Sequence, residues 1–189
     1  VFVSGNAYAG SKPTRFSVVR YGNVMGSRGS VLPFFMHTAK DGTPLPITDE
    51  RMTRLMITIE QGVELVWTAL EDMVGGETYV RKIPSMRVTE IAEAVQPGQP
   101  WKVVGIRAGE KLHEQMIGIE DADFTYDYGD YYKILPANNT WEPGADLIKN
   151  GKKVPEGFSY NSQTNSDWMS VEQLQDWIIA SAGVDTEAF

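Results

Sequence analysis

The chain has 189 residues, of which 42% are hydrophobic, no cysteine, and a net charge of −8. These values allow one substantial core, or one domain with part of another, while the acidic balance argues against general nucleic-acid binding and the lack of cysteine excludes disulfides and thiolate metal sites. Without a run of about 18 apolar residues or a secretory signal pattern, we expect a globular cytoplasmic protein with no membrane partner.

The first predicted element is a turn that contains a pattern typical of a catalytic pair. Residues 8–12 read YAGSK, which is the Tyr-x-x-x-Lys spacing that short-chain dehydrogenases use to move a proton. Here Pro13 follows Lys12 directly and disfavours a helix at that lysine, and Gly10 weakens a helix further. We therefore expect Tyr8 and Lys12 to lie between a helix and the next strand and to have no catalytic role.

Strand-like and helix-like patterns then alternate. The apolar run FSVVRYG (16–22) predicts a strand, and the glycine- and serine-rich residues 23–30 predict a loop at its C-terminal end. A short helix follows over 31–42, and residues 43–57 predict a brief extended piece and a turn. The segment 58–73 has apolar side chains at helical spacing and predicts an amphipathic helix.

The remaining elements are shorter. We expect a strand in 77–84, a helix in 85–98, a strand in 101–107, a loop leading into a helix in 108–118, a strand in 130–136, loops and turns from about 137, and a closing helix over 170–183 with Ser170 as its cap. Because the 16–22 run is continuously apolar, it suits a parallel strand covered on both faces. The sequence therefore predicts an α/β fold with a parallel sheet.

Positive charge is concentrated in the first part of the chain. Residues 1–107 hold 12 Lys or Arg against 10 Asp or Glu, whereas residues 108–189 hold 5 against 15, and all eight arginines lie in the first part. Ordinary surface salt bridges are one interpretation. Arginine also suits phosphate, so an anionic ligand belongs with the first part.

Five long segments carry a resemblance to a known family. They are FSVVRYGNVMGSRGSVLPFF, PITDERMTRLMITIEQGVELV, KIPSMRVTEIAEAV, VVGIRAGEKLHEQMI and YNSQTNSDWMSVEQL. Together they resemble the inverting UDP-N-acetylglucosamine 4,6-dehydratases, which are extended short-chain dehydrogenases of pseudaminic-acid and capsular polysaccharide synthesis. The resemblance implies the C-terminal part of a Rossmann-type sheet plus a small α/β domain that binds a UDP-sugar.

The resemblance also implies a division of the chain. Residues 1–30 would be the last part of the NAD(P)-binding domain, and 31–136 the substrate domain, with segments that return to the first. Residues 137–189 would be a loop-rich region with the closing helix. The family's glycine-rich loop and catalytic Tyr-x-x-x-Lys helix have no counterpart here, so we assign no catalytic residue and expect a chain that is inactive alone.

The family reaction implied by the resemblance is that of a lyase. NADP, or NAD, accepts a hydride from the sugar C4, water leaves across C5 and C6, and the hydride returns to C6. The chain alone is expected to bind no cofactor, although Tyr21, Gly22 and Asn23 match positions near the nicotinamide. A metal is not expected, because His37 and His113 stand in no ligand pattern.

Substrate contacts are implied for eight residues. Arg107 matches the arginine that grips the diphosphate, and Glu110 is placed to accept hydrogen bonds from ribose hydroxyls; Ala108 departs from the usual proline of that motif. The uracil segment matches Val31, Leu32 and Pro33, with Phe34 and Phe35 expected in the core. The other three candidates are Asn23, Arg28 and Arg54.

Each of these three has a simpler interpretation as well. Arg54 and Arg28 could make salt bridges with residues such as Asp49 or Glu50, and Asn23 could be a turn residue. At the level of the whole chain, the alternatives are an inactive UDP-sugar-binding module, a fragment of a UDP-sugar 4-epimerase, and an inert truncated chain. Because missing parallel strands would leave the 16–22 strand unpaired, we expect the chain to form homo-oligomers.

Overall fold

The computed structural model describes residues 2–9, 12–136 and 145–181, and the chain divides into two units. The first unit consists of Val1–Tyr21, Ile59–Lys82 and Gln115–Tyr160. The second consists of Gly22–Thr58, Ile83–Glu114 and Asn161–Phe189. Each unit is therefore assembled from three separate stretches of the sequence, and the division by residue range expected from the resemblance stays a prediction.

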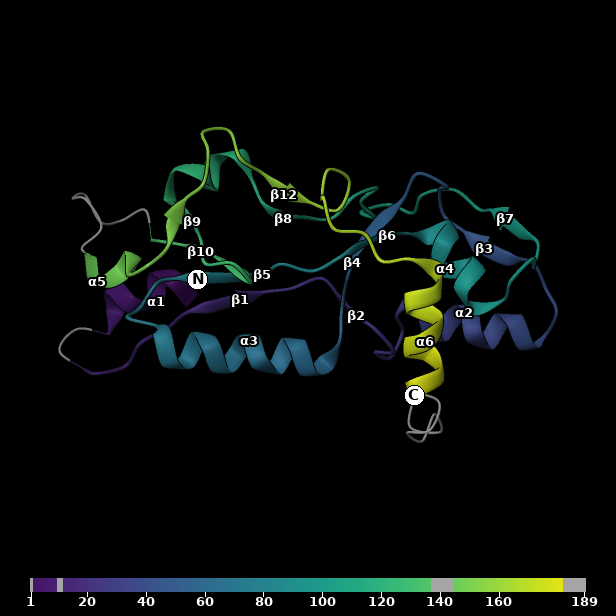
Figure 1. The fold of residues 1–189 in the computed structure, drawn as a ribbon, viewed down its shortest axis with the longest axis horizontal. Helices are drawn as coiled ribbons and strands as arrows, with labels where there is room; N and C mark the ends of the chain where they lie inside the picture. Colours follow the sequence, from purple (N-terminus) through teal and green to yellow (C-terminus); the bar gives the residue numbers. More distant parts are fainter. Residues whose placement is uncertain (1, 10–11, 137–144, 182–189) are drawn as a thin grey trace. The chain divides into compact units, whose positions relative to one another are not determined.

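The first unit is built on a five-stranded sheet (Figure 1). Its strands, in spatial order, are β1 (Val18–Arg20), β5 (Thr78–Arg81), β10 (Tyr131–Ile134), β9 (Thr125–Asp127) and β11 (Lys152–Lys153). The pair β1 and β5 is parallel, with Val18 opposite Thr78, and the other pairs are antiparallel. The helical elements of this unit are α1 (Phe2–Tyr8), α3 (Ile59–Asp72), the 3-10 helix η1 (Ile119–Phe124) and α5 (Ala145–Ile148).

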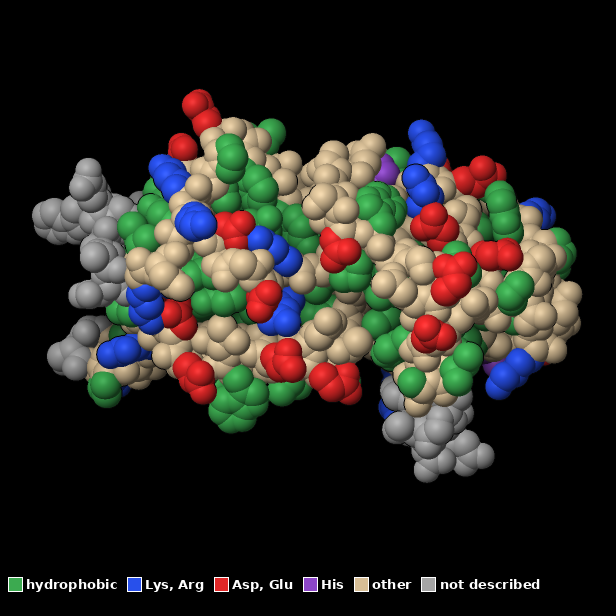
Figure 2. Space-filling model, in the orientation of Figure 1, with side chains coloured by type: hydrophobic (Ala, Val, Ile, Leu, Met, Phe, Trp, Pro, Cys, Tyr) green, Lys and Arg blue, Asp and Glu red, His purple; other side chains and the backbone are tan. Residues whose placement is uncertain are grey.

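Helix α3 packs along β1 and β5 through a narrow face that carries few large side chains. Its buried residues are Gly62, Leu65 and Ala69, and Leu65 and Ala69 join Tyr79 of β5 in one apolar cluster. The larger apolar side chains of α3 are exposed, and Figure 2 shows hydrophobic surface over this helix. They are Ile59, Val63, Val66, Trp67 and Leu70, at 58%, 48%, 39%, 61% and 57% exposure.

Within its described residues, the second unit contains two small sheets and three helices. One sheet has the order β2 (Asn23–Val24), β4 (Thr53–Ile57) and β6 (Ser85–Arg87), and the other pairs β3 (Leu45–Ile47) with β7 (Trp101–Val103) in parallel. The helices are α2 (Val31–Lys40), α4 (Val88–Val95) and α6 (Val171–Ser181). Their shared core includes Leu32, Phe35, Ile47, Ile91 and Leu174, each at most 1% exposed. The strand β8 (Gln115–Ile117), which belongs to the first unit, pairs with β12 (Tyr160–Asn161).

Most predicted elements are confirmed. The α/β class holds, because three strand pairs (β1 with β5, β2 with β4, and β3 with β7) are parallel. The closing helix begins after Ser170, whose Oγ accepts the N–H of Gln173 at 3.2 Å while the Gln173 side chain accepts the Ser170 N–H at 2.8 Å. The predicted loops from 137 onward lie partly outside the described residues.

The predicted helix within 108–118 is wrong. After a turn at Arg107–Glu110, Leu112 O accepts the N–H of Thr53 at 3.1 Å and residues Gln115–Ile117 form β8, so no helix forms in this segment. Pairing with other segments therefore overrides the local sequence pattern. Tyr8, from the YAGSK pattern, ends α1 and is 89% exposed.

Candidate functional site

The second unit encloses a cavity of about 480 Å³. Residues from β2, the start of α2, β3, β4, α4 and the 107–114 segment line it. They are Asn23, Gly29, Ser30, Val31, Phe34, Phe35, Pro46, Thr48, Met52, Arg54, Val88, Arg107, Glu110 and Glu114.

One wall of the cavity is the loop between β2 and α2. Gly26 and Gly29 both have φ of +74°, a backbone conformation that glycine adopts without strain, and they turn the chain into the helix. Ser30 occupies the N-cap position of α2, yet its side chain makes no capping hydrogen bond. Val31 and Phe34, in the first turn of α2, also line the cavity.

Two polar atoms in this wall are buried without a partner among the described residues. They are Asn23 Oδ1 and Ser30 Oγ. Leaving such an atom unsatisfied costs about 1–3 kcal/mol, so a ligand that bonds to it would recover that loss. Asn23 and Ser30 are therefore candidate ligand contacts.

Arg54 lies on β4 and is fixed by the protein around it. Its guanidinium donates to Thr53 O at 2.8 Å, to Leu112 O at 3.3 Å and to Met52 Sδ at 3.0 Å. Its Nε lies 3.5 Å from Glu114 Oε1, and its side chain is 11% exposed. These contacts set the orientation of the guanidinium before any ligand arrives.

The salt bridge suggested for Arg54 with Asp49 does not form. Asp49 pairs instead with Arg51, at 2.8 Å, and Arg54 has Glu114 as its counter-ion. The side-chain hydrogen bond from Arg51 lowers the pKa of Asp49 to about 2. Asp49 is therefore ionised, and its ion-pair partner is Arg51.

Arg107 and Glu110 form a tight turn at the cavity. The N–H of Glu110 donates to Arg107 O at 3.1 Å, and the N–H of Arg107 donates to Glu110 Oε2 at 3.1 Å. Gly109, with φ of +84°, allows this turn. No described residue bonds to the Arg107 guanidinium, which leaves its donors open to an anion.

His113 lies next to β4, the strand that carries Arg54. Its Nδ1 is 2.8 Å from Thr53 Oγ1, and burial, followed by the charges of Arg54 and Arg51, lowers its pKa. The imidazole is therefore neutral near pH 7. Within the described ranges, no three His, Asp or Glu side chains gather in a way that could hold a metal ion.

Five of the predicted ligand residues meet at the cavity. They are Asn23, Val31, Arg54, Arg107 and Glu110. The other five, Tyr21, Gly22, Arg28, Leu32 and Pro33, do not line it.

The surroundings of three of these other residues differ. Leu32 is 1% exposed and belongs to the core, and Tyr21 lies in the first unit. Gly22 is explained by packing, because a Cβ there would lie 2.2 Å from Leu55 O. The close approach of β4 is therefore enough to require a glycine here, and a role for Gly22 at the cofactor stays a prediction.

Sequence reasoning missed Ser30 and Glu114 and misplaced Phe34. Phe34 was expected in the core, but it is 46% exposed and lines the cavity, while Phe35 is buried as expected. One turn of helix cannot bury two consecutive side chains on the same face. Glu114 lies 60 residues from its counter-ion Arg54, so no local pattern in the sequence indicates the pair.

The family model described as "Polysaccharide biosynthesis protein" matches residues 1–136. A Campylobacter jejuni protein named UDP-N-acetylglucosamine 4,6-dehydratase (inverting) is 48% identical over 97% of this chain and 57% of its own length. A Rickettsia canadensis protein named UDP-glucose 4-epimerase is 34% identical over 92% of the chain and 52% of its own length.

A similar fold occurs in a solved structure. The X-ray structure of Pen from Bacillus thuringiensis matches with a TM-score of 0.81 and 28% identity, covering 96% of this chain and 55% of that one. The chain thus spans little more than half the length of the proteins that it matches. Since the family model covers most of the chain, the chain belongs to the polysaccharide biosynthesis protein family.

Proposed function

We propose that this chain is the nucleotide-sugar-binding part of a UDP-N-acetylglucosamine 4,6-dehydratase. The observation that carries the proposal is the cavity that holds Arg54 and Arg107 together with two buried atoms, Asn23 Oδ1 and Ser30 Oγ, that have no hydrogen-bond partner among the described residues. The 48% identity to a protein of that name supports the choice of ligand.

The chemistry of the cavity suits a sugar diphosphate. Its volume of about 480 Å³ lies within the range of roughly 300–1,000 Å³ that small-molecule sites occupy. A diphosphate needs permanent, planar donors that can hold two oxygens, which arginine provides. In the proposed pose Arg107 holds the diphosphate, Glu110 accepts from ribose hydroxyls and Val31 contacts the uracil.

The remaining predicted contacts have weaker support. Leu32 could reach the uracil only with its backbone, because its side chain is in the core. Pro33 and Arg28 do not line the cavity, so a role for either would require a larger ligand or a rearranged loop.

For the reaction itself, the proposal gives this chain a binding role. When NADP or NAD is bound in the intact dehydratase, it supplies the hydride acceptor. Of the three predicted cofactor residues, Asn23 lines the cavity, and its buried Oδ1 has no hydrogen-bond partner among the described residues. We propose that the chain alone binds no cofactor and assign it no catalytic residue.

Two other functions stay open. A UDP-sugar 4-epimerase has the weaker support of 34% identity to the Rickettsia protein, against 48% to the Campylobacter protein. A module that binds a UDP-sugar without converting it would have the same cavity. Incubation of UDP-N-acetylglucosamine with a full-length protein that contains this chain, followed by mass spectrometry, separates the three functions. Loss of water indicates a dehydratase, an isomer of unchanged mass indicates an epimerase, and an unconverted substrate indicates a binding module.

Calorimetric titration of the chain with UDP-N-acetylglucosamine and with UDP tests the binding role. We expect binding that weakens by about 1.5–3 kcal/mol in Arg107→Ala, the range for a hydrogen bond to a charged group. Lys102→Ala, which removes an exposed cation of β7 that does not line the cavity, is the control. The absence of binding at millimolar ligand would contradict the proposal.

We also propose that the chain forms homo-oligomers in the cytoplasm. The exposed apolar residues of α3 support self-association, because apolar patches of this kind usually mark interfaces. Within the described strands, β1 is an edge strand that pairs with β5 alone, which leaves one side open for another chain. The cysteine-free composition fits the proposed compartment.

Light scattering at increasing concentration tests the association. Trp67→Ser is expected to shift the chain toward the monomer, because Trp67 is 61% exposed on α3. Tyr8→Ser, at an 89% exposed aromatic of α1, is the matched control and should leave the mass unchanged. A wild-type chain that stays monomeric at high concentration would contradict the proposal.

The structure adds one finding on membranes. None of the helices in the described ranges is long and apolar enough to span a bilayer.

A further inference from the structure

Ser162 connects a segment far along the chain to the wall of the cavity. Its N–H donates to Glu114 O at 2.8 Å, and its Oγ accepts the N–H of Glu114 at 2.8 Å. Both backbone polar groups of Glu114 are therefore held by one residue. Ser162 itself is 0% exposed, so water does not compete for these bonds.

Glu114 passes this restraint to Arg54. The Glu114 carboxylate lines the cavity, and its Oε1 lies 3.5 Å from Arg54 Nε. We propose that Ser162 is a positioning residue: it fixes Glu114, and Glu114 fixes the direction in which Arg54 presents its guanidinium to the ligand. This inference rests on the proposed nucleotide-sugar function of the cavity.

The buried hydroxyls around Ser162 form a saturated chain of hydrogen bonds. Ser162 Oγ lies 2.7 Å from Thr53 Oγ1 and donates to Thr53 O at 3.2 Å, and Thr53 Oγ1 lies 2.8 Å from His113 Nδ1. One proton order satisfies every atom: His113 Nδ1–H donates to Thr53, Thr53 O–H donates to Ser162, and Ser162 O–H donates to Thr53 O.

This arrangement makes the Ser162 hydroxyl difficult to replace. It accepts from both Thr53 and Glu114 and donates once, so its removal leaves two buried donors without an acceptor. Buried donors seek new partners, and the backbone of Glu114 would have to move to find one. A guanidinium that is already fixed loses little conformational entropy when the ligand binds, which favours affinity.

The test is a double-mutant cycle, with UDP as the probe, read by calorimetry. Ser162→Ala is expected to weaken UDP binding roughly tenfold in the wild-type background, and by less than about twofold when Arg54→Gln is also present. Such coupling is expected only if Ser162 acts through Arg54. Equal weakening in both backgrounds would overturn the proposal.

Two control variants separate positioning from simple loss of stability. Thr53→Val removes a hydroxyl of the same network that has no bond to Glu114, so it should lower stability and leave affinity within about twofold. Thr125→Val removes a hydroxyl of the first unit that is 0% exposed and donates to Asp121 O at 2.7 Å, with the same expectation. Weakening of UDP binding by either variant to the same degree as Ser162→Ala would overturn the proposal.

If Ser162→Ala does not fold, Ser162→Cys keeps the shape of the side chain with weaker hydrogen bonds and should give a smaller loss of affinity in the same cycle. A crystal structure of the folding variant without ligand gives an independent readout. We expect Arg54 Nε to leave its position 3.5 Å from Glu114 Oε1. An unchanged pair would overturn the positioning role, whereas failure of the wild-type chain to bind UDP would overturn only the proposed function.

Discussion

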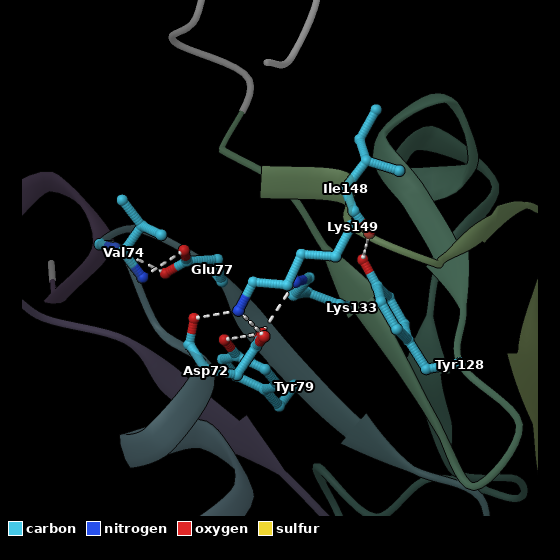
Figure 3. A network of polar contacts seen from close by, with 9 residues as sticks. Asp72, Val74, Glu77, Tyr79, Tyr128, Lys133, Ile148 and Lys149 are labelled. Carbon is cyan, nitrogen blue, oxygen red and sulfur yellow. Dashed lines mark hydrogen bonds and ion pairs between the residues drawn. The ribbon is translucent and has the colours of Figure 1, made fainter. Parts of the chain in front are cut away.

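Lys133 in the first unit and Arg107 in the second are both cations near carboxylates, but their surroundings differ. Lys133 is 1% exposed, donates to Asp72 Oδ2 at 2.8 Å and lies 4.6 Å from the centre of the Tyr128 ring (Figure 3). Arg107 is exposed, and no described residue bonds to its guanidinium. The comparison separates a charge that the fold uses for itself from a charge that is available to a ligand.

The Asp72 site in the first unit is closed. Lys133, Lys149 and the Tyr79 hydroxyl all bond to the Asp72 carboxylate, and Lys149 also reaches Asp72 O at the end of α3 (Figure 3). The Tyr128 hydroxyl donates to Ile148 O at 2.7 Å and so holds the end of α5 beside this site. Such a site contributes to stability, because three donors converge on one carboxylate of the fold itself.

The largest expected effect comes from opening this closed site. Asp72→Asn leaves the buried Lys133 without a counter-ion, and removing one partner of a buried pair costs about 3–5 kcal/mol. Urea denaturation followed by circular dichroism measures the loss. Glu64→Gln breaks the more exposed pair with Arg81, in which the Glu64 side chain is 64% exposed, and should cost less than about 1 kcal/mol. Equal losses would show that the two pairs do not differ.

Acid should weaken the same site. Burial alone would raise the pKa of Asp72, but hydrogen bonds from Lys133, Lys149 and Tyr79 hold it at about 2, below the usual 3.8. A carboxylate whose pKa is depressed in the folded state stabilises the fold above its unfolded pKa, and this contribution is lost as pH falls from about 4 to 2. Urea titrations across this range should show the loss in the wild type and a smaller one in Asp72→Asn.

The comparison sharpens when it is made between the two cavity arginines. Arg54→Lys should reduce the free energy of unfolding by about 1.5–3 kcal/mol, because Lys cannot keep the bonds to Thr53 O and Leu112 O. Arg107→Lys should change stability by less than about 0.5 kcal/mol, while both weaken UDP binding. A large stability loss in Arg107→Lys would contradict the claim that this side chain is free for a ligand.

A pair of glycine variants tests whether packing against β4 explains Gly22. Gly22→Ala puts a Cβ 2.2 Å from Leu55 O, and overpacking of this kind costs about 1–3 kcal/mol. Gly62→Ala is the matched control, because a Cβ there meets nothing within 4 Å and the helix should gain about 1 kcal/mol. Thermal unfolding of both variants gives the comparison; a neutral Gly22→Ala would leave room for a ligand-based reason for this glycine.

The smallest expected effect concerns His113. Burial, followed by the charges of Arg54 and Arg51, lowers its pKa below the usual 6.5. Removing one of these charges in Arg54→Gln should raise the pKa toward 6.5, as measured by NMR titration of the imidazole. An unchanged pKa would show that Arg54 is not held close to this ring.

The sequence predicts elements better than it predicts faces. The α3 helix lies where its periodic apolar residues place it, but Ile59, Val63 and Leu70 are exposed, because spacing identifies an apolar side without saying what covers it. The helix expected in 108–118 fails for a related reason. Its backbone bonds go to Thr53 and Ser162, which lie far from it in the sequence.

The site was predicted in part. Arg54, Arg107, Glu110, Asn23 and Val31 could be named because their motifs are local, and the structure brings them to one cavity. Ser30 and Glu114 could not, since their role depends on an absent capping bond and on an arginine 60 residues away. The sequence also did not predict that Lys133 is buried and paired while Arg107 is exposed, because burial depends on the whole fold.

The most direct test of the central claim is a crystal structure of the chain with UDP. We predict density for the diphosphate in the second unit's cavity, with its oxygens about 2.7–2.9 Å from the Arg107 guanidinium, as charge-assisted bonds require. UDP bound instead at a second polar cavity, which Lys82, Asp127 and Lys152 line in the first unit, would contradict it.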